Sequence, residues 1–436
     1  MFKTLDRDIL RIALPAIVTN ITVPLLGLVD TAIVGHMGAA AYIGAVAVGT
    51  MIFSLVYWIF GFLRMGTSGL TAQARGRRDF GEVTRLLRLS VVVSLAVSLA
   101  LLLLQWPLRE LMLWFISPTD DVRQWAVTYF NIVVWGAPPM LCLYALTGWF
   151  VGMQNTRLPM VVSIVQNVVN ILASLTLVYA LGMKVEGVAL GTVIAQYVGL
   201  LTGVLFMWRY YGRLFRKYES TTTRRHQLKA FLRVNRDIFI RTLFLVAVNL
   251  YFTSAGARQG AVILAVNTLL IQLYLLFSYV MDGFAYAGEA LGGRYWGGEN
   301  LLAFRKVLKR LFAWGALMTI VFTLGYVAGG IRFLRLLTDE PSVVCASTVY
   351  VWWAYLIPVA GVAAFVWDGI FIGMTQTRGM LISSCIAAIG FFVCSLLLMP
   401  SWGNHGLWAA MLLFLSMRGI TQTLIYYKTE HRSLSC

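Results

Sequence analysis

The most informative side chains of this 436-residue sequence are polar or ionisable groups inside long apolar stretches. Asp30 lies in the run TVPLLGLVDTAIVG (22–35), close to the end of its stretch. A carboxylate at the centre of a membrane helix costs roughly 2.5–3.5 kcal/mol on insertion scales. An acid kept there indicates a group that binds a proton, a cation or a cationic ligand. The structural alternative is a buried, hydrogen-bonded acid that holds helices together.

A second polar surface follows in two later apolar stretches. The candidates spaced four residues apart are Gln166, Asn170 and Ser174 on one predicted helix, and Thr192 and Gln196 on the next. Residues four apart share one face of a helix. These amides and hydroxyls can therefore face Asp30, either as coupling groups or as hydrogen bonds between helices.

The second half of the chain offers three further carboxylates inside apolar stretches. They are Asp282 in MDGF, Asp368 in VWDGIF, and Glu289, which we expect near the cytoplasmic end of its span, where solvent reaches it. Arg64 and Arg418 are the arginines that we place inside spans. A cavity for an anionic headgroup would need such cations.

Several function classes lack their sequence signatures. There is no GxxxxGK[ST] loop for ATP, no HExxH among the four histidines and no GxSxG. The five cysteines are scattered without a CxxC pair, and we interpret them as free thiols. We therefore expect no enzyme activity, no bound metal and no organic cofactor.

The elements that must position these residues are membrane helices. Charged residues make up 12% of the chain, against roughly 25% in soluble proteins, and the mean hydropathy is +0.78. Helices satisfy their own backbone hydrogen bonds in lipid, so we predict an all-α polytopic membrane protein. The twelve predicted transmembrane helices are 9–34, 42–66, 87–108, 125–149, 158–181, 187–208, 237–257, 262–288, 311–330, 343–372, 380–400 and 405–427.

Lysine and arginine predict the orientation of these spans. With the N-terminus inside, 27 of the 35 basic residues fall in cytoplasmic segments, which predicts that both termini are cytoplasmic. The longest basic segment, 209–241, lies at the middle of the chain. We interpret it as a topology anchor near anionic lipid headgroups, so its positive charge does not require a nucleic-acid partner.

The chain also repeats itself. A shift of 222 residues aligns Tyr57 with Tyr279, and a shift of 221 aligns GMQNTR (152–157) with GMTQTR (373–378). Each half carries six spans, so the halves are parallel repeats suited to alternating access around a central cavity. The predicted domains are an N-terminal six-helix lobe (1–211), a cytoplasmic basic linker (212–232) and a C-terminal six-helix lobe (233–436).

Five motifs carry a resemblance to a known family. They are ITVPLLGLVDTAIVGHMG (21–38), FLRMGTSGLTAQARG (62–76), GMQNTR (152–157), MDGFAYAGEALGGRYWG (281–297) and GMTQTR (373–378). Together they resemble the multidrug and toxic compound extrusion (MATE) family, in its DinF branch, over essentially the whole chain. The resemblance implies twelve helices in two six-helix lobes, and antiport of amphipathic or cationic compounds against H⁺ or Na⁺.

The resemblance also implies residue roles. The family's acid on its first span matches Asp30, as a protonation site, and the polar neighbours match Asn170, Thr192 and Gln196. Relatives commonly carry an aspartate where this chain has Ser174. A Na⁺ site would then lose one of its two carboxylates, which favours H⁺ coupling.

In the second half, the family's acid on span ten is similar in place to Asp368. Asp282 matches the motif DGFA, and roles there vary among relatives.

These observations lead to one expected function and two alternatives. We expect a secondary antiporter in which H⁺ entry drives export of amphipathic or cationic small molecules, with Asp30 as the proton and substrate site. The alternatives are a Na⁺-coupled drug antiporter and a flippase for a lipid-linked precursor. We expect a multi-pass monomer in a bacterial cytoplasmic (inner) membrane, in contact with membrane lipids and without a nucleic-acid partner.

Overall fold

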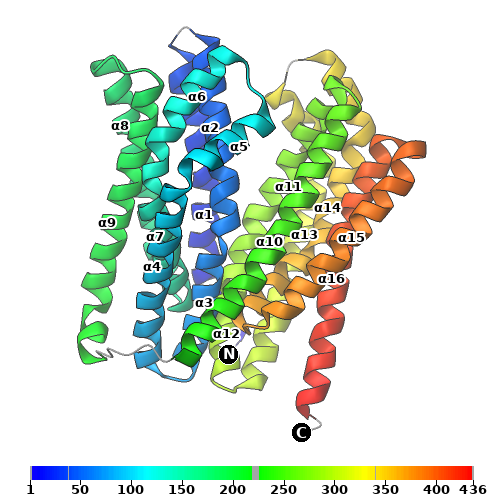
Figure 1. Ribbon diagram of the computed structural model, residues 1–436. Coiled ribbons are helices and arrows are strands. Elements are labelled where there is room, and N and C mark those ends of the chain that lie inside the picture. Colours follow the sequence, from blue (N-terminus) through cyan, green and yellow to red (C-terminus); the bar gives the residue numbers. More distant parts are fainter. Residues whose placement is uncertain (1, 38, 219–224, 339, 435–436) are drawn as a thin grey trace. The chain divides into compact units, whose positions relative to one another are not determined.

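The computed structural model describes residues 2–37, 39–218, 225–338 and 340–434, and every regular element in these ranges is helical. Figure 1 shows the helices in chain order. The prediction of an all-α membrane protein is confirmed, because the apolar stretches form helices that are long enough to cross a bilayer.

The elements of the first half are α1 (Phe2–Gly35), α2 (Ala40–Phe60), α3 (Phe62–Gly76), α4 (Phe80–Leu103), α5 (Gln105–Ile116), α6 (Asp120–Val133), η1 (Val134–Gly136), α7 (Ala137–Gly152), α8 (Arg157–Leu175), η2 (Thr176–Ala180) and α9 (Val185–Lys217). Those of the second half are α10 (Arg225–Arg258), α11 (Ala261–Ala287), η3 (Gly288–Gly292), α12 (Gly293–Gly297), α13 (Leu301–Leu337), α14 (Pro341–Gly373), α15 (Thr377–Trp402) and α16 (Asn404–Leu434).

Eleven helical segments of the described residues are long and apolar enough to span a membrane. Some combine consecutive elements, such as Ala40–Gly76, which joins α2 to α3. Helix α1 covers the first predicted span, 9–34, and with 34 residues it is about 50 Å long. That length exceeds the roughly 30 Å hydrocarbon core. The twelve predicted spans therefore each have a helix.

The chain divides into two compact units, residues 18–232 and residues 1–17 with 233–436. Helix α1 contributes to both, because its first half belongs to the unit that holds the second half of the chain. The predicted N-terminal lobe, 1–211, differs from the unit 18–232, because residues 1–17 belong to the unit that contains residues 233–436. Of the predicted linker 212–232, residues 219–224 lie outside the described part. The linker residues before and after this gap are mostly helical, because α9 ends at Lys217 and α10 begins at Arg225.

The two halves have the same order of helices. The membrane segments Ala40–Gly76 and Ala261–Gly297 begin and end 221 residues apart, and so do Asp120–Gly152 and Pro341–Gly373. This offset agrees with the sequence shift of the GMQNTR and GMTQTR motifs. The halves are therefore parallel repeats of one six-helix arrangement.

A close helix crossing recurs at the same place in both repeats. A Cβ atom on Gly148 of α7 would lie 2.2 Å from the carbonyl oxygen of Arg64, and one on Gly369 of α14 would lie 2.3 Å from that of Ala285. Both members of each pair are 221 residues apart. Such distances exclude any side chain, so glycine lets the backbones touch.

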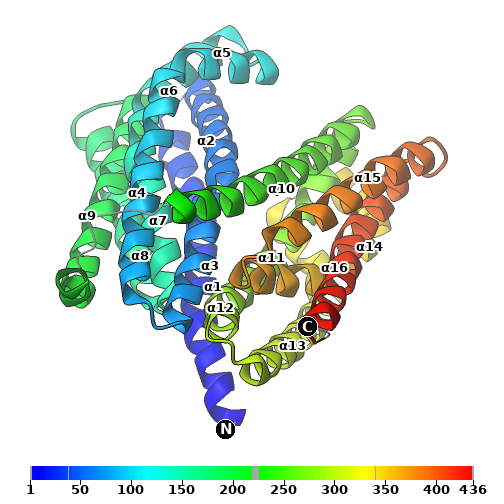
Figure 2. The ribbon, with the colours of Figure 1, turned by 60° about the horizontal axis from the view of Figure 1, so that its bottom comes forward.

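Helix α14 is the centre of the unit formed by residues 1–17 and 233–436. It packs against α11, α13 and α16, and α16 in turn packs against α15. Figure 2 shows α14, α15 and α16 side by side. Most of the last turns of α14 are buried, including Phe371 and Ile370. A polar residue on this helix is therefore held away from solvent.

Candidate substrate and ion site

Asp30 lies on α1 with a side chain only 5% exposed. Its Oδ1 atom is buried and has no hydrogen-bond partner among the described residues. Helix α1 is held beside α8 by two contacts of Thr22: its hydroxyl lies 3.3 Å from that of Ser163, and its carbonyl accepts from Asn167 Nδ2 at 3.1 Å. These contacts hold α1 beside α8 about two turns before Asp30. No cation pairs with Asp30 among the described residues.

Polar groups of four other helices lie near this acid or near its neighbour Tyr129. The charge of Asp30 acts on Tyr129 of α6, whose hydroxyl lies within reach of the hydroxyls of Thr50 and Thr192. Thr192 of α9 accepts a hydrogen bond of 3.1 Å from Nδ2 of Asn170 on α8. Asn170 and Thr192, which the sequence analysis placed on two polar helix faces that could face Asp30, are in contact with each other.

Three other oxygen atoms near these helices are buried without a partner among the described residues: Asn170 Oδ1, Ser174 Oγ and Gln196 Oε1. Ser174 faces Gly191 of α9, where a Cβ would lie 2.3 Å from its Oγ. Gln196 faces Gly136 and lies near the Tyr57 hydroxyl, without a hydrogen bond of ordinary geometry. These oxygens can accept hydrogen bonds or coordinate a cation.

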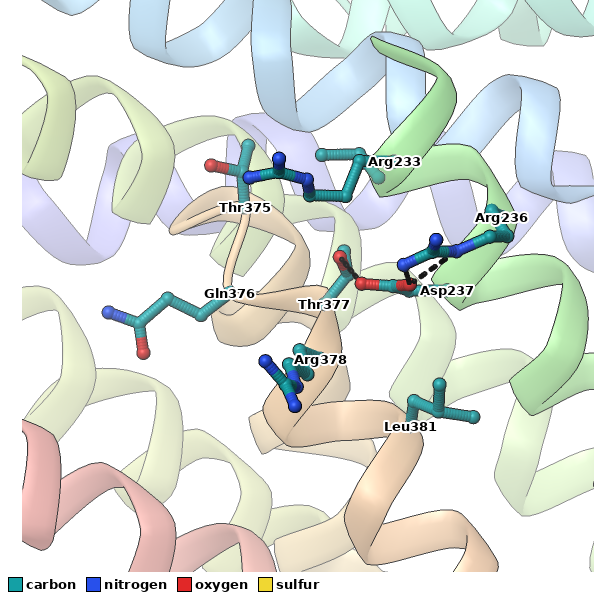
Figure 3. Close-up of a pocket in the computed structure, with 9 residues that line it drawn as sticks. Arg233, Arg236, Asp237, Thr375, Gln376, Thr377, Arg378 and Leu381 are labelled. Carbon is teal, nitrogen blue, oxygen red and sulfur yellow. Dashed lines mark hydrogen bonds and ion pairs between the residues drawn. The ribbon is translucent and has the colours of Figure 1, made fainter. Parts of the chain in front are cut away.

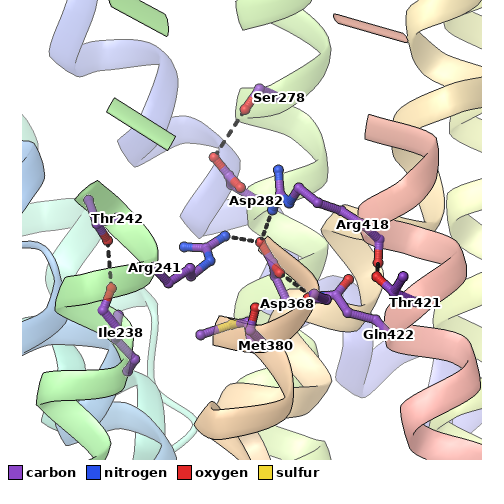
Figure 4. Close-up of polar contacts among 11 residues, drawn as sticks. Ile238, Arg241, Thr242, Ser278, Asp282, Asp368, Met380, Arg418, Thr421 and Gln422 are labelled. Atoms are coloured by element: carbon purple, nitrogen blue, oxygen red, sulfur yellow. Dashed lines mark hydrogen bonds and ion pairs between the residues drawn. The ribbon is translucent and has the colours of Figure 1, made fainter. Parts of the chain in front are cut away.

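Asp368 of α14 differs from Asp30, because both of its carboxylate oxygens have hydrogen-bond partners (Figure 4). Its Oδ2 accepts hydrogen bonds from Arg241 of α10 and from Arg418 of α16, the latter over 2.5 Å. Its Oδ1 accepts from Gln422 Nε2 at 2.7 Å. All four residues are buried. Two guanidinium groups and an amide therefore satisfy this carboxylate.

Asp282 of α11 and Tyr274 extend the charged cluster. The charges of Asp282 and Asp368 both act on Arg241 and on Tyr274, and Asp282 lies 3.4 Å from the hydroxyl of Ser278. Two acids thus accompany two arginines in this unit. The cluster is close to electrically neutral, although Nε of Arg241 and of Arg418 is left without a hydrogen-bond partner in the part described.

Two sequence-based placements are wrong. Arg241 was assigned to the basic segment between spans, but it lies within α10, is 5% exposed and is paired with Asp368. Glu289 was expected where solvent reaches it, but it lies in the π-helical turn η3 and is 1% exposed. Arg241 was counted with the basic segment although it also lies inside the predicted span 237–257, and Glu289 is buried because the helical chain continues past the predicted span end at 288.

A separate polar cavity of about 700 Å³ lies where α10 passes the α14–α15 junction (Figure 3). Its charged lining residues are Arg233, Arg236, Asp237 and Arg378. Asp237 is buried, pairs with Arg236 at 2.9 Å and accepts from the Thr377 hydroxyl at 3.2 Å. Since three cations face one acid, this cavity favours anions over cationic compounds.

Sequence reasoning missed Tyr129 and the pairing of Arg241. Tyr129 packs on Gly49 of α2, where a Cβ would lie 2.1 Å from a ring carbon, and only the structure shows this contact. The pairing of Arg241 with Asp368 joins residues 127 positions apart. A single sequence contains no direct mark of such a contact.

Comparison with known proteins agrees with this arrangement. The family model MatE matches residues 15–176 and 238–397, one match in each half. The chain is 36% identical to DNA damage-inducible protein F of Escherichia coli (strain K12), over 97% of this chain and 92% of that protein. It is 24% identical to the probable multidrug resistance protein NorM of Acinetobacter baylyi, over 98% and 96% of the two chains.

A solved structure has the same fold. The crystal structure of the Vibrio cholerae MATE transporter VcmN in the bent form matches with a TM-score of 0.86 and 17% identity, over 98% of this chain and 97% of that chain. The two family matches, one in each repeat, cover most of the sequence. This multi-pass membrane protein therefore belongs to the MatE family of transporters.

Proposed function

We propose that the protein is a secondary antiporter that exports amphipathic, cationic compounds in exchange for H⁺, with Asp30 as the shared proton and substrate site. The observation that carries the proposal is the contrast between the two buried acids. Asp30 has an oxygen without a partner in the described structure, whereas Asp368 accepts from two guanidinium groups and an amide.

A buried carboxylate without a counter-charge is unfavourable, because its hydration is lost and nothing replaces it. Its occupant must therefore supply a positive charge, and a proton or a cationic compound does so. One acid cannot be neutralised by both at once. Competition between proton and substrate for Asp30 gives exchange, and alternating access of the two lobes carries each occupant across the membrane.

The residues around Asp30 favour H⁺ over Na⁺. Na⁺ is a hard cation that needs several oxygen ligands and gains from negative charge. Ser174, Asn170 and Gln196 offer buried oxygens, but none of them is charged. With one carboxylate a Na⁺ site is weak, whereas a proton needs only that carboxylate.

The acids of the second half have a different role in this proposal. Asp368 would remain paired throughout the cycle, because two arginines hold it. Asp282 helps to balance those arginines. Glu289 lies in the crossing between η3 and α14, where a Cβ on Gly373 would lie 2.9 Å from its carbonyl oxygen. We assign these acids to the integrity of the fold.

The remaining features of the proposal follow from sequence and family. We propose a monomer in a bacterial inner membrane, with both termini cytoplasmic, since this orientation places most basic residues inside. It transports small molecules without chemical conversion and uses no cofactor besides the coupling ion. The buried arginines would favour the flippase alternative, but Asp368 and Asp282 offset their charge.

The test is transport of a fluorescent cationic dye in proteoliposomes, driven separately by a pH gradient and by a Na⁺ gradient. We compare the natural protein with Asp30→Asn and with the control Asp121→Asn, which removes an exposed acid from the first turn of α6. We expect transport driven by the pH gradient, lost in Asp30→Asn and kept in Asp121→Asn. Transport driven only by Na⁺, or unchanged in Asp30→Asn, would contradict the proposal.

A further inference from the structure

A pocket of about 510 Å³ lies on the unit formed by residues 1–17 and 233–436, between α13, α14 and α16. Arg305 and Lys309 line it from α13, and four aromatic rings line it from all three helices: Phe312, Trp367, Tyr426 and Tyr427. The lining contains two cations and no carboxylate. None of the residues that we assign to transport lines it.

We propose that this pocket binds the phosphate headgroup of an anionic phospholipid. Arg305 and Lys309 are four residues apart on α13, so their side chains share one face of the helix. Lys309 is exposed and forms no ion pair within the described residues. Two cations on one face supply the charge that a phosphate diester requires, and they repel a cationic transport substrate.

The Thr423 side chain of the pocket is already satisfied. The Thr423 hydroxyl accepts a hydrogen bond of 2.7 Å from Trp367 Nε1 and donates one of 2.7 Å to the carbonyl of Gly419. The Trp367 ring meets Phe312 edge-on and Tyr426 at a tilt, with ring centroids 5.3 and 4.7 Å away. The floor of the pocket is therefore a rigid aromatic surface, and specificity for charge comes from α13.

The helix next to the pocket also suits the acyl chains. After Phe312, α13 carries large apolar side chains that are more than 40% exposed, among them Leu317, Ile320 and Leu324. A lipid whose phosphate lies at Arg305 and Lys309 can lay its chains along this apolar face. A free phosphate would leave the aromatic and apolar part of the pocket unused, so a phospholipid fits better.

Bound lipid would also act next to the charged cluster. Trp367 precedes Asp368 in α14, and Thr423 follows Gln422 in α16. Trp367 and Asp368 share one turn of α14, and Gln422 and Thr423 share one turn of α16. The two turns are joined because Gln422 donates a hydrogen bond to Asp368. Occupancy of the pocket therefore stabilises the helix turns that hold the cluster together. This inference does not depend on the coupling ion or on the role of Asp30.

The experiment measures retention of phosphatidylglycerol or cardiolipin by native mass spectrometry of the full chain. Phosphatidylcholine and inorganic phosphate are separate arms. The variants are Arg305→Gln/Lys309→Gln, the milder Lys309→Gln, and the control Lys306→Gln, an exposed lysine of the same helix outside the pocket. Thermal unfolding of each variant without lipid confirms that it is folded.

We expect preferential retention of anionic lipid, weakened on the order of tenfold in the double variant, less in Lys309→Gln, and unchanged in Lys306→Gln. Three results would overturn the proposal: equal retention of phosphatidylcholine, equal losses in Lys306→Gln and Lys309→Gln, or competition by inorganic phosphate at the same concentration as lipid. The last result would assign the pocket to a soluble phosphate instead.

Discussion

Arg418 Nη2 donates a hydrogen bond of 2.5 Å to Asp368 Oδ2, and both side chains are buried between α14 and α16. Arg241 of α10 donates to the same oxygen. Three helices are thus joined through one carboxylate. Among the described residues no cation pairs with Asp30 on α1, and this difference is the basis of our proposal that Asp368 is a fixed structural charge and Asp30 an exchangeable one.

The first prediction concerns removal of the fixed charge. Asp368→Asn leaves two buried guanidinium groups without their main counter-ion, and breaking a buried pair in this way costs about 3–5 kcal/mol. We expect a clear fall in the thermal unfolding temperature of the purified protein in nanodiscs. A double variant, Asp368→Asn with Arg418→Met, should recover part of the loss. An unfolding temperature equal to that of the natural protein would show that the pairing contributes nothing.

The second prediction has the opposite sign. Asp30→Asn removes an acid that has no cationic partner, so the folded state loses no ion pair. We expect an unfolding temperature equal to or above that of the natural protein, measured at pH 8, where unpaired carboxylates are most strongly driven to ionise. A destabilisation as large as that of Asp368→Asn would mean that Asp30 is a structural acid.

The third prediction tests the crossing that both repeats share. Gly148→Ala and Gly369→Ala each push a methyl group against a backbone carbonyl, and overpacking of this kind costs about 1–3 kcal/mol. The matched control is Gly329→Ala, because a Cβ at that helical glycine meets nothing within 4 Å. Thermal unfolding should drop for the first two variants only. Equal behaviour of all three would refute the close crossing.

The fourth prediction concerns the hydroxyl next to the proposed proton site. Tyr129→Phe keeps the ring that packs on Gly49 but removes the group near Asp30, Thr50 and Thr192. We expect transport driven by the pH gradient to fall by roughly tenfold, the effect of one buried hydrogen bond of about 1.4 kcal/mol. Tyr197→Phe, which loses only an exposed contact to the Trp135 carbonyl, serves as the control.

The fifth prediction concerns an ion pair outside the membrane spans. In α5, Arg109 hydrogen-bonds Glu110 and, with Arg123, lowers the pKa of its carboxyl. A lowered pKa means that the pairing stabilises the fold above the unfolded-state pKa and is lost as the pH falls through the folded-state pKa.

Carbon-13 NMR titration of Glu110 measures this effect. Arg109→Gln should move the titration of Glu110 to higher pH, toward the ordinary value of about 4.3. The same titration in Arg123→Gln should move less, because Arg109 makes the larger contribution. If neither variant moved the titration, the ion pair would be absent in solution.

The sequence predicted the architecture well because a membrane imposes strong rules on each span. Helix order follows from hydropathy, and the repeat follows from the constant sequence shift between the two halves. Four-residue spacing placed Asn170 and Thr192 each on a polar helix face, but it did not predict their contact with each other. The pairing of Asp368 did not follow, because it depends on Arg241, whose position looked like part of a cytoplasmic basic segment. Long-range charge pairs arise from packing between helices, and helix periodicity contains no information about them.

The central claim is that Asp30 exchanges a proton for a cationic substrate. Its most direct test is to measure proton release into weakly buffered solution when a cationic dye binds to the purified protein in nanodiscs. We expect proton release when the dye binds to the natural protein, and also when it binds to those molecules of the Asp368→Asn variant that are folded. We expect no proton release when the dye binds to Asp30→Asn. Undiminished proton release in Asp30→Asn, with the dye still bound, would contradict it.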